Sequence, residues 1–362
     1  MKNWFETNHA KLQFALRMML AALASFALGE ALGLAQTYWA VLSAVIVIQA
    51  SIGGSVRAAI NRLTGTLGGA FWGALVAMTI PHGSPASMAV ALIAGTAPLA
   101  IFTAFRPEYR IAPITAIIVL LGGGQPQAGP FSSALERVLE ISLGSAVAVA
   151  VALLILPARA HRLLAHAASG AVADMARIVS MLDEAHARGA SPEALWRLQV
   201  RLSAEVAGAD SRAGEAKVER ANYLAEGPDP EPLARTLRRL RNDLAMLSRA
   251  LGASSSDALH DGLRSELSPL LRAIAGWFNA LAKALASGEP APSLETIRAT
   301  VEDYRAAISC AGDEGLASVA GGEGNQRVFV LLFVFEQMLQ NLQDLAARTN
   351  ELSESDSKRS RV

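Results

Sequence analysis

The stretch that decides the fold runs from Tyr38 to Gly73 and reads YWAVLSAVIVIQASIGGSVRAAINRLTGTLGGAFWG. A Tyr-Trp pair opens an apolar run that extends to Ile52, and a glycine pair then precedes Arg57 and Arg62. A second apolar run follows from Leu63. Aromatic residues at one end and arginines at the other are typical of a bilayer-spanning hairpin. We therefore predict a membrane hairpin with a break at the glycine pair and a positively charged turn on the cytoplasmic side.

Small residues recur at helical spacing in the second run of this hairpin and again further along the chain. Gly65, Gly69 and Gly73 are four residues apart, and Gly144 opens a similar small-residue face. Such faces let a neighbouring helix approach closely inside a membrane. We predict that these glycines are helix-packing positions, either within one chain or against a second copy.

Charge divides the chain into two parts. Residues 1–157 hold thirteen Asp, Glu, Lys or Arg residues, whereas the remaining 205 residues hold fifty-one, and the first aspartate is Asp174. A charge-poor segment followed by a charge-rich one indicates a membrane domain joined to a soluble domain. We predict an all-α protein with a transmembrane domain over residues 1–157, a cytoplasmic helical bundle over 158–350 and a disordered tail over 351–362.

Six apolar segments account for the first part. The loops after the first, third and fifth segments carry no charge, whereas the turns after the others carry arginines, which places both termini in the cytoplasm. The second and fifth segments are shorter than the length of about 20 residues that crosses a bilayer squarely, and Pro113 interrupts the fifth. The predicted spans are Leu12–Leu32, Tyr38–Ile52, Leu63–Ile80, Met88–Phe105, Ile111–Leu121 and Val138–Leu156.

The second part shows leucine-rich seams with alternating four- and three-residue spacing, which helices packed nearly antiparallel require. We predict that each seam faces the core of a helical bundle. The seams are Leu233, Leu237, Leu240, Leu244, Leu247 and Leu251; Leu263, Leu267, Leu270, Ile274, Trp277 and Leu281; and Leu331, Phe335, Met338, Leu342 and Leu345.

Ionisable and polar groups within membrane segments mark a pathway or pair with a partner, because isolated charges are costly there. Arg57 and Arg62 could attract an anionic substrate, since guanidinium groups match carboxylates bidentately. They could equally set the topology and bind lipid phosphates. Arg17 is predicted at the inner interface, and Gln49 lies in the short second segment. With Thr66, which is one turn from Arg62, these residues form the predicted substrate pathway.

A second group of charges, Glu30, Glu136, Arg137 and Glu140, is predicted towards the outer face. Arg17 is too far along its helix to reach Glu30, because thirteen residues at 1.5 Å each separate them by about 20 Å. Glu30 and Arg137 lie near the same predicted interface. We expect them to form a structural ion pair, or the group to couple transport to protons.

Other chemistries find no support in the sequence. No phosphate-binding loop, zinc spacing or hydrolase motif occurs, so we predict no enzyme, metal or cofactor. The single Cys310 rules out an intrachain disulfide. The basic run from Arg235 to Arg241 is interleaved with leucines and is one face of an amphipathic helix, so we predict no nucleic-acid partner.

Together these features resemble the fusaric acid resistance protein superfamily (FUSC), which includes bacterial aromatic acid exporters. The resemblance covers roughly residues 10–160. It implies export of small carboxylated aromatics from the cytoplasm across the inner membrane, driven by the proton gradient, often with a periplasmic adaptor protein. It rests on Tyr38-Trp39-Ala40, Gln49, Gly53, Gly54, Arg57, Arg62, Gly65-Thr66, Gly69, Glu136-Arg137-Val138, Gly144 and Pro157.

The chain departs from that family in size. Typical exporters of the family look like two six-span halves joined, whereas this sequence supplies one half, and a homodimer would restore the second. Two alternatives to a secondary exporter stay open. One is a passive anion channel, similar to plant malate channels with the same plan of six spans and a helical tail. The other is a membrane-anchored helical scaffold that binds a partner through its bundle.

Overall fold

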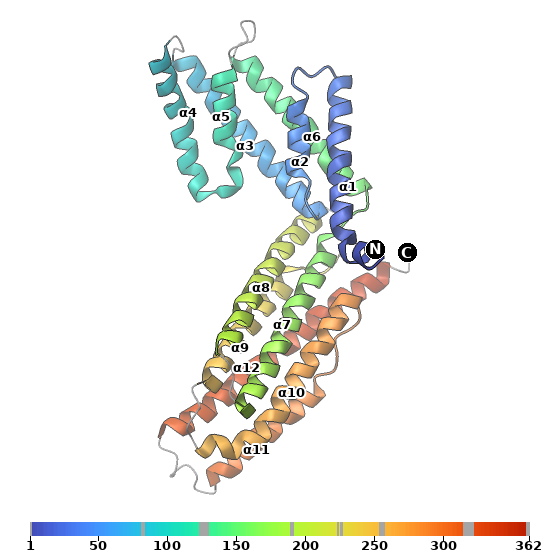
Figure 1. Ribbon diagram of the computed structural model, residues 1–362, viewed down its shortest axis with the longest axis vertical. Coiled ribbons are helices and arrows are strands. Elements are labelled where there is room, and N and C mark those ends of the chain that lie inside the picture. Colours follow the sequence, from blue (N-terminus) through green and yellow to red (C-terminus); the bar gives the residue numbers. More distant parts are fainter. Residues whose placement is uncertain are drawn as a thin grey trace. The chain divides into compact units, whose positions relative to one another are not determined.

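The computed structural model describes residues 2–80, 84–122, 130–188, 192–222, 224, 227–252, 258–313 and 322–359 of the 362-residue chain. The predicted all-α class is confirmed over these residues, which form helices and no strand. The chain divides into two compact units, Met1–Ala160 and His161–Val362 (Figure 1). The division falls next to Pro157, where the charge-poor sequence ends.

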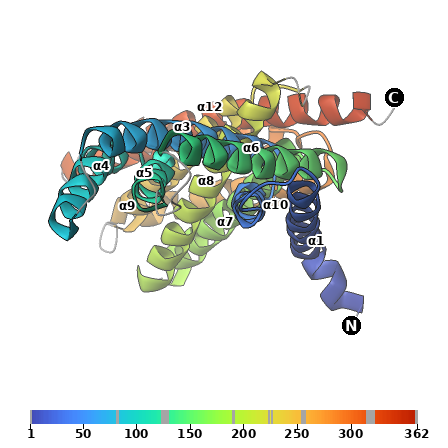
Figure 2. The same cartoon turned by 90° about the horizontal axis from the view of Figure 1, so that it is seen from above.

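The first unit, here called the membrane unit, is built around two long helices, α3 and α6, which lie side by side (Figure 2). Helix α5 packs on α3 and α4 packs on α5, whereas α2 packs on α6 and α1 contacts both α2 and α6. The elements are α1 (Lys2–Ala31), α2 (Tyr38–Val47), α3 (Ile52–Thr79), α4 (Pro85–Phe105), the short 3-10 helix η1 (Pro107–Tyr109), α5 (Ile111–Gly122) and α6 (Pro130–Leu154).

Three helical stretches in the described part of the chain are long and apolar enough to cross a membrane: Lys11–Ala31, Pro85–Phe105 and Ala134–Leu154. Helix α2 is apolar but only 10 residues long, and α5 has 12 residues. Helix α3 has 28 residues and carries two arginines. The six-span arrangement therefore stays a proposal.

The break in the central hairpin lies earlier than the sequence predicts. The predicted break at Gly53 and Gly54 is wrong, because both glycines lie in the first turn of α3. Ser51 is the N-cap, and its side chain accepts a hydrogen bond from the Gly54 backbone N–H at 2.9 Å. This cap satisfies one of the amide groups that a helix start leaves unpaired. Consequently Arg57 and Arg62 lie on α3 and not in the turn before it.

Pro113 does not interrupt the fifth apolar segment, contrary to the prediction. It lies in the first turn of α5, which runs unbroken over Ile111–Gly122. The first turn of a helix has no intrahelical acceptor for its amide groups, so the missing proline N–H costs nothing there.

The second unit, here called the bundle unit, has one continuous apolar core to which every helix of the unit contributes. The predicted seams are buried at every position whose side chain the structure describes, and Leu263 lies outside that set. The helices are α7 (Ala160–Arg188), α8 (Pro192–Ala221), α9 (Glu231–Gly252), α10 (Ala258–Ser287), α11 (Glu295–Asp313) and α12 (Gly322–Arg359).

The predicted disordered tail from residue 351 is wrong as far as Arg359, because α12 continues to that residue. Leu352 packs against the core of the bundle unit. One turn earlier, Arg348 Nη1 pairs with Glu351 Oε1 at 2.5 Å. Apolar contact on one face and an i,i+3 ion pair on the helix surface favour continued helix in a segment whose composition is polar.

Candidate functional site

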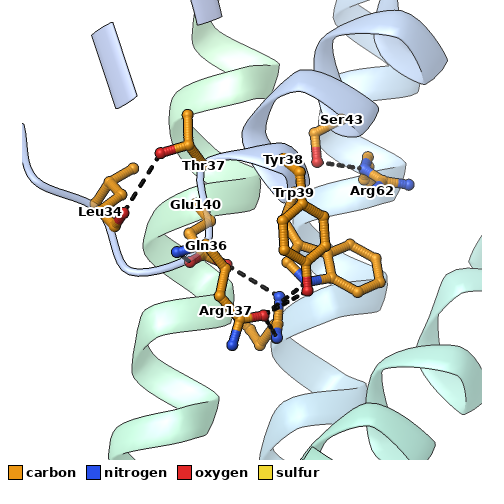
Figure 3. Close-up of polar contacts among 9 residues, drawn as sticks. All are labelled: Leu34, Gln36, Thr37, Tyr38, Trp39, Ser43, Arg62, Arg137 and Glu140. Atoms are coloured by element: carbon orange, nitrogen blue, oxygen red, sulfur yellow. Dashed lines mark hydrogen bonds and ion pairs between the residues drawn. The ribbon is translucent and has the colours of Figure 1, made fainter. Parts of the chain in front are cut away.

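Arg62 on α3 is buried, with 5% of its surface exposed. Its Nε atom donates a hydrogen bond to the Oγ atom of Ser43 on α2 at 3.1 Å (Figure 3). Its Nη1 atom is buried and has no acceptor among the described residues. A guanidinium group is always charged and carries five N–H donors, so Ser43 satisfies only part of its requirement.

Arg17 on α1 is the second buried guanidinium, and 2% of its surface is exposed. Its Nη2 atom donates to the backbone carbonyl of Ala50 at 3.1 Å. Ala50 lies in the connector between α2 and α3. The Nε and Nη1 atoms of Arg17 are buried and find no acceptor within the described part of the chain. Arg17 and Arg62, here called the arginine pair, thus both donate to the segment formed by α2 and the connector after it.

Arg17 and Arg62 have no carboxylate partner among the described residues, and several hydroxyl groups of the membrane unit are buried without a partner as well. Neither arginine forms an ion pair with a described residue, and the hydroxyl of Thr66, one turn along α3 from Arg62, is also buried without a partner. The Ser25 and Ser145 hydroxyls are in the same condition. Buried charges that lack a counter-ion are costly. An anion that accepts hydrogen bonds would remove that cost, and this is what the arrangement can do chemically.

The other predicted pathway residues lie on the surface of the membrane unit. Arg57 is exposed, although it is on the same helix as Arg62. Gln49 is exposed in the connector, where its Nε2 atom donates to the Ile46 carbonyl at 3.0 Å. The predicted set therefore separates into a buried group, Arg17, Arg62 and Thr66, and an exposed group, Arg57 and Gln49.

A second polar group links the turn between α1 and α2 to α6 (Figure 3). Arg137 Nη1 pairs with Glu140 Oε2 at 3.1 Å, and the guanidinium lies 4.5 Å from the centre of the Trp39 ring. Gln36 Oε1 accepts from Arg137 Nη2, from the Tyr38 hydroxyl at 2.7 Å and from Trp39 Nε1 at 3.2 Å. The Gln36 backbone N–H donates to Glu140 Oε1 at 2.9 Å. We call these five residues the Gln36 cluster.

The Gln36 cluster corrects the predicted pairing of Glu30 with Arg137. Arg137 pairs with Glu140, one turn away on α6, because residues three apart on a helix are neighbours. Glu30 and Glu136 are both exposed. Sequence reasoning missed Gln36, although an amide side chain two residues before the Tyr-Trp pair, in a short uncharged loop, could have drawn attention to it.

A comparison with protein families identifies the chain. The family model for the fusaric acid resistance protein family matches residues 11–362. The chain belongs to this family. The match continues to the end of the chain, well past residue 160, where the resemblance seen in the sequence ends. A search of curated proteins found no match. Membership in the fusaric acid resistance protein family makes this a membrane-embedded protein and indicates a function in transport or efflux.

In this fusaric acid resistance family protein, the conspicuous glycines pack helices of one chain together. A Cβ atom on Gly69 would lie 2.2 Å from the Ala112 carbonyl oxygen of α5, and one on Gly73 would lie 2.9 Å from Ala116 Cα. On α6, a Cβ atom at Gly144 would lie 2.0 Å from the Ala40 carbonyl oxygen of α2. Gly65 is less tightly enclosed, with its nearest neighbour at 3.5 Å. The glycine face of α3 is therefore occupied by α5.

Proposed function

We propose that this fusaric acid resistance family protein exports small aromatic carboxylic acids from the cytoplasm across a bacterial inner membrane. The observation that carries the proposal is the arginine pair. Two buried guanidinium groups keep N–H donors that find no acceptor among the described residues of the membrane unit. A negatively charged substrate supplies the missing acceptors, whereas a simple membrane tether has no use for such groups.

Arg62 is the proposed carboxylate-binding residue. Ser43 holds its Nε atom, which leaves the Nη1 atom for the substrate, and the Thr66 hydroxyl is available one turn away on the same helical face. Hydrogen bonds between charged partners are roughly twice as strong as neutral ones. Arg17 provides a second attachment point, so that the acid passes from one guanidinium to the other.

Glu140 is the proposed proton-coupling residue. It is the buried carboxylate of the Gln36 cluster, and it holds both Arg137 and the Gln36 backbone. Protonation of Glu140 would remove its charge and weaken both attachments. Glu30 and Glu136 are exposed, whereas Glu140 is buried. A proton gradient acting on Glu140 would therefore change how the turn between α1 and α2 is fixed to α6.

The test compares two arginines on one helix. Arg62→Gln removes the buried charge but keeps hydrogen-bonding capacity, and Arg57→Gln makes the same change at an exposed position. Uptake of radiolabelled benzoate into inside-out membrane vesicles should fall by roughly tenfold or more for Arg62→Gln, the loss expected for a hydrogen bond to a charged group. Arg57→Gln should retain uptake, and both proteins should insert to the same level. Arg62→Lys should recover only part, because lysine lacks the planar fork.

Equal uptake by the wild-type and Arg62→Gln proteins would contradict the proposal. Cells with and without the gene should also differ in sensitivity to aromatic acids. Unchanged sensitivity to every aromatic and aliphatic acid would favour the alternative of a membrane-anchored scaffold, whose bundle unit binds a partner protein.

A passive anion channel is the second candidate, and one observation favours it. Glu140, the carboxylate proposed to carry protons, is already neutralised by Arg137. An uncoupler distinguishes the two functions. It should abolish accumulation of benzoate against its gradient by an exporter, whereas a channel would equilibrate benzoate with or without it.

A homodimer is the proposed assembly, because a second copy would supply the second half that the resemblance to two-half exporters implies. A periplasmic adaptor is a further proposed partner. The α3 glycines pack on α5 of the same chain, so the dimer contact would lie on another face. Mass measurement of the purified protein by light scattering tests this. A monomer that transports normally would remove the dimer from the proposal.

A further inference from the structure

Three hydrogen-bond donors of the membrane unit converge on one neutral oxygen. Gln36 Oε1 accepts from the Tyr38 hydroxyl, Trp39 Nε1 and Arg137 Nη2 (Figure 3). An amide oxygen has two lone pairs, so three donors exceed what it satisfies well. The donors come from α2 and α6, whereas the acceptor comes from the turn before α2. A carboxylate group carries a negative charge and two acceptor oxygens, so it fits this set of donors better than an amide does.

We propose that Tyr38, Trp39 and Arg137 form a second substrate site for aromatic carboxylates, which the Gln36 side chain occupies when no acid is bound. The Gln36 amide oxygen stands in for one carboxylate oxygen of the acid. The substrate class rests on the proposed function, but the site itself rests on the convergence of donors. The Gln36 side chain thus competes with the acid for these donors, and the acid must displace it to bind.

Arg137 and the Trp39 ring keep other contacts when the Gln36 side chain leaves. Arg137 is held independently by Glu140 at 3.1 Å and by the face of the Trp39 ring at 4.5 Å. The Gln36 backbone N–H is bound to Glu140 at 2.9 Å, so rotation about the side-chain bonds of Gln36 is enough to clear the site. A site whose groups are fixed beforehand binds its ligand without a further ordering cost.

The aromatic ring of the acid has a surface beside these donors. Tyr38 is 54% exposed, and its ring lies 5.3 Å from the Trp39 ring at an angle of 38°. Aromatic rings favour offset or tilted contacts at such distances. A benzoate whose carboxylate replaces the Gln36 oxygen can therefore stack its ring against Tyr38, whereas acetate gains only the polar contacts.

The experiment measures benzoate binding by calorimetry, with the full-length Arg62→Gln protein in nanodiscs of zwitterionic lipid. The Arg62→Gln change weakens the first site, so that the binding measured comes mainly from the Gln36 cluster, and calorimetry does not require transport. Gln36→Ala, which removes the competing side chain, should tighten benzoate binding by about tenfold, since the apparent affinity rises with the fraction of open sites. Gln36→Glu places a permanent carboxylate on the donors and should abolish benzoate binding. Acetate should bind more weakly than benzoate to both the Gln36→Ala and the parent protein.

The two substitutions at Gln36 separate this site from a structural brace. If Gln36 is only a structural brace, Gln36→Glu keeps or strengthens the brace, and this protein should bind benzoate like the parent. Gln36→Ala would weaken the brace and should gain no affinity for benzoate. Either result overturns the proposal. Loss of benzoate binding when anionic lipid replaces zwitterionic lipid would also overturn it, by assigning the donors to lipid headgroups. Tightened binding by Gln36→Ala, together with a wild-type protein that does not transport benzoate, would keep this site and reject only the exporter function.

Discussion

The Nε atom of Arg62 on α3 donates a hydrogen bond to the Oγ atom of Ser43 on α2 over 3.1 Å. Ser43 is completely buried, and α2, at 10 residues, is the shortest α-helix of the membrane unit in the described part of the chain. A short helix thus supplies the acceptor that orients a buried guanidinium. This contact sets which N–H groups of Arg62 remain for a ligand.

Ser43→Ala should weaken substrate binding by removing that acceptor. A hydrogen bond to a charged group contributes about 1.5–3 kcal/mol, which is roughly tenfold or more in affinity. The benzoate concentration that half-saturates vesicle uptake should rise accordingly. Thr64→Ala is the matched control, since Thr64 is exposed on the same helix as Arg62, and among the described residues its hydroxyl bonds to the Ile60 and Asn61 carbonyls of that helix. Equal half-saturation for the Ser43→Ala and wild-type proteins would show that Ser43 does not position Arg62.

Two adjacent glycines on α3 should respond differently to alanine. Gly69→Ala places a Cβ atom 2.2 Å from the Ala112 carbonyl oxygen, whereas a Cβ atom at Gly68 meets nothing within 4 Å. Forcing α3 and α5 apart should cost about 1–3 kcal/mol. Gly68→Ala should be neutral or stabilising, by up to about 1 kcal/mol, because alanine favours helix. Thermal unfolding of the detergent-solubilised protein measures both, and equal midpoints would show that α5 does not pack on this face.

The six-span proposal predicts where single cysteines react in intact cells. In a Cys310→Ser background, a cysteine at the exposed Ser84, before α4, should react with a membrane-impermeant maleimide. A cysteine at the exposed Ser287, at the end of α10, should react only after the cells are permeabilised. Labelling of Ser287→Cys in intact cells would place the bundle unit outside and reverse the orientation that the positive-inside rule predicts.

Asp243 should make the stability of the bundle unit depend on pH. Burial raises the pKa of its carboxyl, although hydrogen bonding from Asn341 and the charge of Arg239 oppose the shift. At pH values between the unfolded pKa, about 4, and the raised native pKa, the native state keeps this proton and the unfolded state has lost it. The free energy of unfolding therefore falls as the pH rises through this range. Asp243→Asn should remove this fall while it keeps the pairing with Asn341, which binds Asp243 at 2.6 Å.

The measurement is the unfolding midpoint of the full-length protein in detergent between pH 4 and 7. The advantage of Asp243→Asn over wild type should grow as the pH rises, whereas Asp303→Asn, at an exposed position on α11, should track wild type. Parallel curves for the Asp243→Asn and wild-type proteins would refute the link between this buried carboxyl and stability.

Local sequence properties were sufficient for much of the architecture. The leucine seams of α9, α10 and α12 are buried as their period predicts, because helical periodicity places such residues on one face whatever that face contacts. The scarcity of charge before Pro157 marks the extent of the membrane unit for a similar reason. Apolar composition is a property of a segment and needs no knowledge of its neighbours.

Predictions that depend on which residue lies next to another in the folded chain were less accurate. Glu30 and Arg137 share a predicted interface, yet Arg137 pairs with Glu140. The tail looks polar, yet Leu352 meets the core and α12 continues to Arg359. In both cases the outcome depends on which surface another helix presents, and a sequence pattern does not contain that information.

Arg57 and Arg62 show most plainly what the sequence by itself determined and what only the tertiary structure decided. The sequence determined that two arginines follow the first apolar run of the hairpin. Arg57 and Arg62 are five residues apart, and at about 100° per residue their side chains point about 140° apart on a helix. The two arginines therefore cannot share a face. The tertiary structure decided which one is enclosed: α2 packs where Ser43 meets Arg62, and Arg57 stays exposed. The convergence of donors on Gln36 was decided in the same way, because it joins α2 and α6, which are about a hundred residues apart in the chain.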